Sequence, residues 1–225
     1  MAVDLVEIVA RQAPSPHYHY SDCARDDILR MIPDDGRVIG SVGCGWAATE
    51  WVLAKSGRIV HGVDVSQEAI EVAKTRLTSA RVVSPAEPRL FEYQSLDGLI
   101  LADVLEHMPN AWMALKDLSQ ALRPGGWAVI SVPNMQSLNV LVQLFFLGDW
   151  PEKKMGIFDE THIQMMTRRR LERWFGAADL GVERWFHRYQ DNRKGRLFRV
   201  IDALSLGVLH DWLTYEWQCV CRKRG

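Results

Sequence analysis

Hydrophobic positions along the chain fall into short, nearly uninterrupted runs separated by amphipathic stretches and turns. The runs predict buried strands at 37–42, 58–63, 81–84, 99–102, 127–132, 182–189 and 215–222. Apolar residues at helical spacing predict helices at 22–32, 49–55, 66–79, 110–122 and 167–177. Because strands and helices alternate, we expect βαβ units and a parallel sheet covered on both faces.

Two segments of the last third depart from this rhythm. Residues 135–162 form a long, aromatic and irregular stretch, where we expect substrate contacts. Between the last two predicted strands, apolar residues at 197–208 recur at helical spacing and predict a small helical cap.

Charge and hydropathy narrow the class of protein. The 225 residues include 27 Lys and Arg against 28 Asp and Glu, a net charge of -1, which argues against a nucleic-acid partner. The longest apolar stretch, 138–147, is far shorter than the roughly 20 residues of a transmembrane helix. Asp4 and Glu7 interrupt the apolar N-terminus, which is untypical of a signal peptide, so we expect a cytoplasmic protein.

A glycine-rich turn carries the first chemical signal. Gly43-Cys44-Gly45 follows a predicted strand and opens a helix, and Asp64 ends the next strand. Such a turn lets a ligand approach bare backbone at a helix N-terminus, and the acid can accept hydrogen bonds from ribose hydroxyls. Alone, the pattern fits both a nicotinamide dinucleotide and S-adenosylmethionine.

Further motifs follow in a fixed order after this turn. They are Gly62-Val-Asp-Val-Ser66, Leu101-Ala-Asp-Val-Leu-Glu-His107, Leu122-Arg-Pro-Gly-Gly126 and Ser131-Val-Pro-Asn134. In order and spacing the chain resembles the class I S-adenosylmethionine-dependent methyltransferases over residues 17–185. The stretch 156–162, followed by Thr167, resembles a subgroup associated with bacterial glycan and small-molecule O-methylation, and the ubiquinone-type O-methyltransferases are more distant relatives.

The resemblance implies an α/β, Rossmann-like fold. We expect a seven-stranded sheet, mostly parallel with an antiparallel last strand, helices on both faces and a small helical cap on the substrate side. One methyltransferase domain would span 1–225, with an N-terminal flap and helix at 17–35 and substrate-side insertions at 135–166 and 190–213. The run His17-Tyr18-His19-Tyr20 resembles the flap that family members lay over the cofactor, although it could instead seal a helix against the sheet.

The same resemblance implies a set of cofactor-binding residues: Ser41, Gly43, Cys44, Gly45, Asp64, Val65, Ala86, Ala102 and Asp103. Two positions depart from the family. Ser41 stands where an acid usually helps to fix the amino end of the methionine group, and Ala47 replaces a third glycine. Loss of that acid weakens cofactor binding unless another acid, such as Asp103, compensates for it. Ala86 lies in an aberrant third-strand region and is expected to contribute a backbone contact only.

Two histidines are candidates for the base that deprotonates an acceptor hydroxyl: His107 and His162. Each has a structural alternative, since His107 could hydrogen-bond its own loop and His162 could cap the helix near Thr167. The group Asp103, Glu106 and His107 resembles a set that holds a divalent metal in some ubiquinone-type relatives, with Asp159 able to complete it. The Glu-His pair recurs without metal in the wider family, so no metal is favoured.

These observations predict a methyltransferase that transfers the methyl group of S-adenosylmethionine to a hydroxyl of a small molecule or glycan precursor. An NAD(P)-dependent oxidoreductase and a cofactor-binding protein without catalysis remain as alternatives. The apolar run at 138–147 and the cap at 197–208 leave three roles open: the wall of an acceptor pocket, contact with a membrane surface that carries a lipid-linked acceptor, or a homodimer contact.

Overall fold

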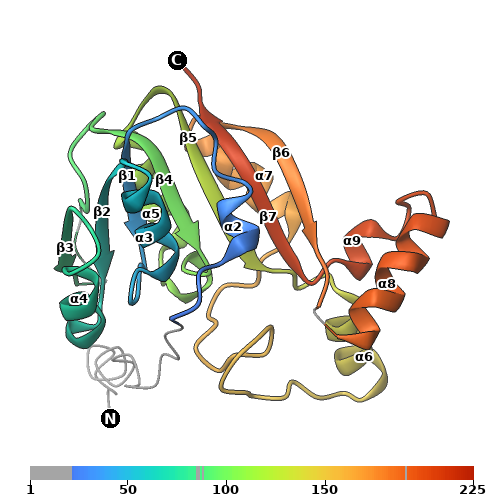
Figure 1. Cartoon of the computed structure of the whole chain (residues 1–225). Helices are drawn as coiled ribbons and strands as arrows, with labels where there is room; N and C mark the ends of the chain where they lie inside the picture. Colours follow the sequence, from blue (N-terminus) through green and yellow to red (C-terminus); the bar gives the residue numbers. More distant parts are fainter. Residues whose placement is uncertain (1–21, 85–86, 88, 191) are drawn as a thin grey trace, which may run out of the picture.

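A seven-stranded sheet forms the centre of the computed structural model, which describes residues 22–84, 87, 89–190 and 192–225 (Figure 1). The strand order is β3-β2-β1-β4-β5-β7-β6. The strands are β1 (Val38–Val42), β2 (Ile59–Asp64), β3 (Ser79–Val82), β4 (Leu96–Ala102), β5 (Leu122–Pro133), β6 (Leu180–Arg188) and β7 (Glu216–Lys223). In this sheet β7 runs in the direction opposite to the other six strands, so the last strand is antiparallel as predicted.

Helices cover both faces of the sheet, which confirms the predicted layers. On one face lie α2 (Asp26–Leu29), α3 (Ala48–Lys55) and α4 (Gln67–Ala73), and on the other lie α5 (Ala111–Gln120) and α7 (Arg168–Ala177). Each face has its own buried cluster. Ile28 and Ile70 pack on the first face, and Leu115 and Phe175 pack on the second.

Three further helices gather at one end of the molecule (Figure 1). They are α6 (Leu138–Phe146), α8 (Arg193–Leu204) and α9 (His210–Leu213), and we refer to them together as the cap. The buried side chain of Asn134 fastens the cap to the end of β5, because its Nδ2 donates to the carbonyl oxygens of Asp211 and Thr214 at 2.8 Å each. No helix in the described ranges is long and apolar enough to cross a bilayer.

The helices differ from the predicted ones in three places. The helix predicted at 22–32 is confined to α2, and the one predicted at 66–79 ends at Ala73 because the chain must enter β3 at Ser79. The stretch expected to be irregular contains α6. Its apolar residues occupy more than one helix face, so the sequence lacks the one-sided periodicity that reveals a surface helix.

Two sequence-based predictions fall outside the described residues: the flap at His17-Tyr18-His19-Tyr20 and the backbone contact of Ala86.

Candidate active site

The predicted cofactor residues lie where parallel strands end at one edge of the sheet. The turn Gly43-Cys44-Gly45 follows β1, Val65 follows β2, and Ala102 and Asp103 stand at the end of β4. Open α/β sheets bind ligands outside this carboxyl edge. Residues from three separate strands are therefore brought together as the motif order predicted.

Left-handed backbone makes the glycine turn possible. Gly43 and Gly45 have φ of 69° and 52°, and Ala47, at 57°, adopts the same region although it carries a side chain. The N–H of Gly45 donates to Oδ2 of Asp64 at 2.8 Å, and the N–H of Ser66 donates to Oδ1 at 2.9 Å. These bonds fix the carboxylate of Asp64 beside the turn, and carboxylate oxygens are suitable acceptors for ribose hydroxyls.

A buried acid that the sequence motifs did not indicate lies next to Ser41. The Ser41 hydroxyl donates to Oε1 of Glu50 at 2.7 Å, and both side chains are buried. Burial raises the pKa of Glu50, and the nearby charge of Asp64 raises it further. Glu50 thus places a carboxyl group from α3 beside the position where the family carries an acid on β1. Its signal in the sequence was an acid in the first turn of a mostly apolar helix.

Asp103 was suggested as the compensating acid, but it pairs with Arg25. Oδ2 of Asp103 lies 2.5 Å from Nη1 of Arg25, and Ser131 donates to its other oxygen at 3.0 Å. Arg25 also pairs with the buried Glu216 at 2.8 Å, which in turn pairs with Arg188. Asp103 is thus part of an ion-pair network, whereas Glu50 contacts Ser41 directly. Glu216 had no signal in the sequence.

His107 lies on a single 3-10 turn, η1 (Leu105–His107), that follows β4. Its Nδ1 lies 3.2 Å from the carbonyl oxygen and 3.0 Å from the hydroxyl of Thr161, whose hydroxyl donates to Asp159 at 2.5 Å. A carbonyl oxygen only accepts hydrogen bonds, so Nδ1 carries the proton and Nε2 carries the lone pair. Burial lowers the pKa of His107, which keeps the imidazole neutral.

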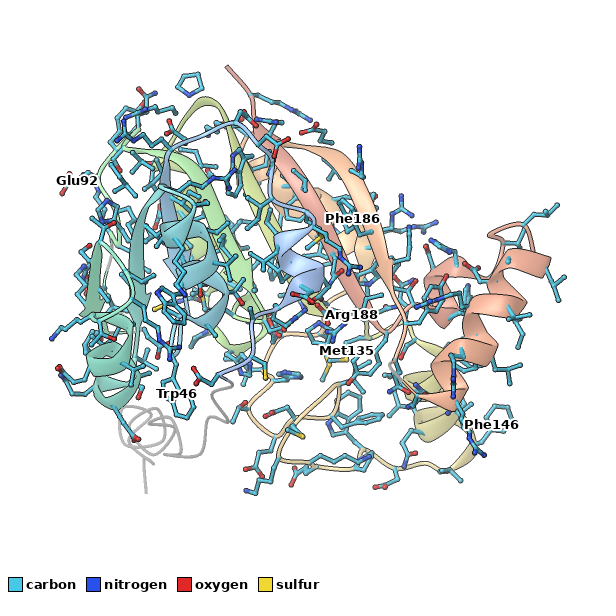
Figure 2. The ribbon with its side chains drawn as sticks, viewed as in Figure 1. Trp46, Glu92, Met135, Phe146, Phe186 and Arg188 are labelled. Carbon is cyan, nitrogen blue, oxygen red and sulfur yellow. The ribbon has the colours of Figure 1, made fainter. Side chains whose placement is uncertain are left out.

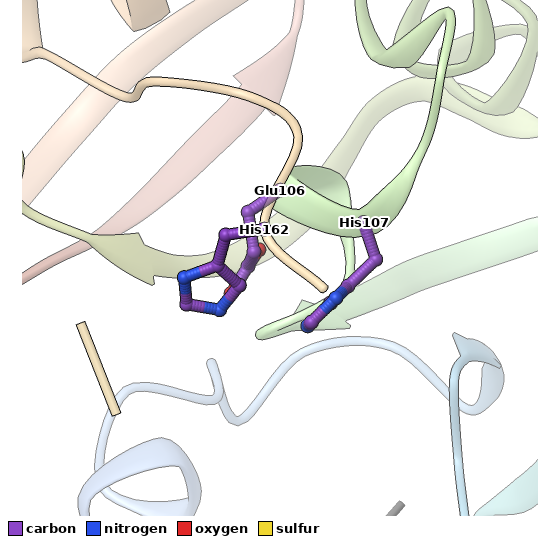
Figure 3. A group of neighbouring side chains, drawn as sticks. All are labelled: Glu106, His107 and His162. Carbon is purple, nitrogen blue, oxygen red and sulfur yellow. The ribbon is translucent and has the colours of Figure 1, made fainter. Parts of the chain in front are cut away.

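The second histidine lies beside the first. The ring centroids of His107 and His162 are 4.8 Å apart, and Glu106 lies behind His162, with Oε1 3.9 Å from its Nε2 (Figure 3). The N–H groups of Ile163 and Gln164 both donate to the carbonyl oxygen of Glu106, at 2.9 and 3.0 Å, and so hold the irregular segment against η1. Burial lowers the pKa of His162, and the neighbouring His107 lowers it further.

Potential metal donors are present in this group. One ligand atom from each of Glu106, His107 and His162 lies within 4.8 Å of the others, whereas the predicted set contained Asp103. Burial raises the pKa of Glu106 well above its ordinary value, and the charge of Asp103 adds to this. A carboxyl group binds a metal only when it is deprotonated. Without a cation beside it the Glu106 carboxyl is therefore held neutral, and the chemistry of the site is described with protein groups alone.

A pocket of about 310 Å³ lies between α6, the segment 153–158 and the start of α8. Lys153, Lys194 and Tyr215 contribute its polar lining, and Val142 and Met155 contribute apolar surface. The pocket adjoins the histidines through Ile157, whose carbonyl oxygen lies 3.4 Å from Nδ1 of His162. One wall of the pocket is therefore in direct contact with His162.

Comparison with known proteins agrees with this geometry. A family model described as a methyltransferase domain matches residues 17–184. A ubiquinone biosynthesis O-methyltransferase from Coxiella burnetii (strain RSA 493 / Nine Mile phase I) is 31% identical over 112 residues, 48% of each chain. One of the same name from Shewanella sp. (strain ANA-3) is 30% identical over 151 residues, 64% of each chain. The chain spans about half the length of the first of these relatives.

Solved structures show the same fold. A methyltransferase structure from Methanosarcina mazei superposes with a TM-score of 0.62 at 17% identity, covering 90% of this chain and 99% of the other. A methyltransferase structure from Archaeoglobus fulgidus superposes with a TM-score of 0.59 at 17% identity, covering 83% of this chain and 86% of the other. Both are described as S-adenosylmethionine-dependent. With a family match over residues 17–184, most of its length, this chain belongs to the methyltransferase-domain family.

Proposed function

We propose that the protein methylates a hydroxyl group of a small molecule or glycan precursor, with His107 as the base. The observation that carries this proposal is the pairing of His107 Nδ1 with the two oxygens of Thr161, which presents Nε2 as the basic nitrogen. An amine acceptor that is already neutral needs no such base, whereas an alcohol or phenol must lose a proton.

Different residues of the chain bind different parts of the cofactor. Asp64 accepts hydrogen bonds from the ribose hydroxyls, and the backbone of Gly43 and Gly45 lets the cofactor lie close to the turn. The Glu50 carboxyl, beside Ser41, attracts the ammonium group of the methionine moiety. When bound, S-adenosylmethionine supplies an electrophilic methyl group. A cationic ligand also favours the ionised form of Glu50, whose pKa burial otherwise raises.

His107 and its neighbours provide the proton transfer. An acceptor hydroxyl gives its proton to Nε2 of His107. The resulting imidazolium continues to donate a hydrogen bond from Nδ1 to the carbonyl oxygen of Thr161. The hydrogen bond from the Thr161 hydroxyl to Asp159 orients Thr161 and brings negative charge near the imidazolium. Thr161 and Asp159 are thus positioning residues, and His162, in contact with the same ring, shapes the space beside it.

The named relatives support an oxygen acceptor. Two ubiquinone biosynthesis O-methyltransferases align with this chain over about half to two thirds of their length. The pocket beside His162 combines two lysines with apolar surface, a lining that suits an acceptor with both an anionic and an apolar part.

Formation of S-adenosylhomocysteine with phenols, sugar hydroxyls and amines tests the proposal. We expect turnover with a hydroxyl acceptor, and His107→Gln should lower kcat about 100-fold or more because the base is lost. Thr161→Val should lower kcat less and shift its pH profile, because it removes only the side-chain partner of Nδ1. Binding of S-adenosylhomocysteine should be unchanged in both variants.

Two results would count against this assignment. One is methylation of amines alone. The other is full turnover of a hydroxyl acceptor by His107→Gln with loss of turnover in His162→Gln, which would transfer the role of base to His162.

A further inference from the structure

The cap exposes large apolar side chains on both of its longer segments. Phe145 and Phe146 at the end of α6 are 80% and 82% exposed, and Leu204, Leu206 and Val208 in and after α8 are 80%, 92% and 79% exposed. Figure 2 shows Phe146 at the far end of α6, away from the sheet. Soluble proteins rarely leave so much apolar surface together without a partner.

Helix α8 is amphipathic, but its apolar side faces the solvent. Leu197, Val200 and Leu204, at i, i+3 and i+7, form an exposed apolar stripe, whereas the polar Asp202 faces the protein. Asp202 accepts a hydrogen bond from the Tyr189 hydroxyl at 2.6 Å and pairs with His210. The helix is therefore fastened by polar contacts and offers its apolar side outward.

Helix α6 repeats this arrangement. Leu138, Val142, Phe145 and Phe146, at i, i+4, i+7 and i+8, are exposed along one side, and the run 138–147 carries no charged residue. The Nζ of Lys194 lies 2.5 Å from Oδ1 of Asn139, which joins the start of α8 to α6. The two apolar stripes therefore belong to one end of the molecule (Figure 1).

Basic side chains flank the apolar stripe of α8. They are Arg193, Lys194, Arg196 and Arg199, all of them exposed. Within the described part of the chain, no carboxylate lies within ion-pair distance of any of the four. Near α6, the exposed acids Asp149 and Glu152 are followed by Lys153 and by Lys154, which pairs with Glu160 at 2.5 Å, so the positive character of this end comes from α8.

We propose that the cap docks the protein on the surface of a membrane that contains anionic lipids. An apolar stripe flanked by Arg and Lys is the pattern of helices that lie in the bilayer interface, where the apolar side enters the acyl boundary and the cations meet lipid phosphates. The pocket lined by Lys153 and Lys194 lies between α6 and α8, within the docked end. The inference concerns binding to the surface and does not depend on the nature of the acceptor.

Charge favours this partner over a second copy of the chain. In a two-fold dimer the same patch meets itself, so the basic side chains of α8 would face their own equivalents. Like charges across an interface repel, and the cores of protein interfaces are depleted of charged residues. An anionic bilayer neutralises these cations while it covers the apolar stripes.

Sedimentation with vesicles of phosphatidylcholine, with and without phosphatidylglycerol, tests the proposal on the full chain. We expect binding that requires phosphatidylglycerol and weakens with salt. Arg196→Glu should reduce the partition coefficient about tenfold or more, and Leu204→Glu should reduce it by a similar factor. The controls Lys116→Glu and Met113→Glu change an exposed cation and an exposed apolar residue on α5, away from the cap, and should bind as the wild type does.

The melting temperature and the binding of S-adenosylhomocysteine should be unchanged in all four variants, which separates this test from that of the catalytic proposal. The inference would be overturned if the protein does not bind vesicles, or if binding is equally strong without phosphatidylglycerol. It would also be overturned if neither Arg196→Glu nor Leu204→Glu weakens binding. A dimer in solution that Leu204→Glu dissociates, together with absence of vesicle binding, would assign the surface to a second copy and also overturn it.

Discussion

Hydrogen bonds to main-chain oxygens decide how the two histidines differ. Nδ1 of His107 lies 3.2 Å from the Thr161 carbonyl oxygen and also contacts the Thr161 hydroxyl, whereas Nδ1 of His162 has the more distant carbonyl oxygen of Ile157 at 3.4 Å. The sequence identified both residues but could not separate them, because their partners come from a segment without regular structure. This difference in the hydrogen bonds of Nδ1 is the reason why we propose His107 as the base.

The pH dependence of turnover follows from the environment of His107. Burial lowers its pKa below the ordinary value of 6.5, so the basic form persists to lower pH than in a free imidazole. We expect kcat to be constant around neutral pH and to fall only as the pH drops through this lowered pKa. A pH profile of kcat with a saturating acceptor measures it, and an acid limb centred above 6.5 would contradict the assignment.

The cluster of Glu106, His107 and His162 allows a test with a chelator. Because the proposed mechanism uses His107 as the base and no metal, we expect turnover to persist after treatment with a chelator. Metal analysis of the protein should accompany the assay. Loss of activity that Mg²⁺ or Zn²⁺ restores would show that Glu106, His107 and His162 hold an ion and would replace the base mechanism with a metal-assisted one.

Glu50 links the site to the stability of the fold. Its folded-state pKa is raised, so the stability that its neutral form contributes is present at low pH and is lost as pH rises through the folded pKa. The free energy of unfolding of Glu50→Gln, relative to wild type, should therefore increase from acidic to alkaline buffer. Denaturant titrations measure it, with Glu68→Gln on the surface of α4 as the matched control. If the difference in unfolding free energy between Glu50→Gln and the wild type does not change with pH, the pKa of Glu50 is not raised in the folded protein.

At the level of elements, the sequence predicted strands better than helix ends. Buried strands such as β1 and β5 can be recognised by their continuous apolar runs, because both faces of the sheet are covered. The end of α4 depends on where β3 joins β2, which is a long-range contact. Helix α6 was missed because its exposed side is apolar, and a pattern based on burial does not recognise such a helix.

Close packing between β4 and β5 makes Gly98 indispensable. A Cβ at this position would lie 2.2 Å from the ring of Trp127, which is fully buried and donates from Nε1 to the Asp35 carbonyl oxygen at 2.8 Å. We expect Gly98→Ala to destabilise the protein by about 1 to 3 kcal/mol or more, the usual cost of overpacking. Thermal or denaturant unfolding measures this effect.

Gly176→Ala in α7 is the matched control, because a Cβ there meets nothing within 4 Å. It should leave the stability unchanged or raise it slightly. Equal effects of the two substitutions would contradict the packing argument.

At the scale of the whole molecule, the topology brings the site together. The turn after β1, Asp64 on β2 and η1 after β4 meet because parallel strands end at one edge, and the order of motifs was sufficient to predict this. The ion pairs of Arg25 were not predictable, since Glu216 lies 191 residues away and enters through the antiparallel β7. The pairing of Ser41 with Glu50 likewise depends on how α3 packs on β1.

Calorimetric titration of the wild type and two variants tests most directly whether this edge binds the cofactor as described. Asp64→Ala should weaken S-adenosylhomocysteine and adenosine alike, about 10-fold or more, because both ligands carry the ribose. Glu50→Gln should weaken only S-adenosylhomocysteine, because adenosine lacks the ammonium group. If both variants bind both ligands as tightly as the wild type does, the cofactor lies elsewhere and the proposed arrangement of the site is wrong.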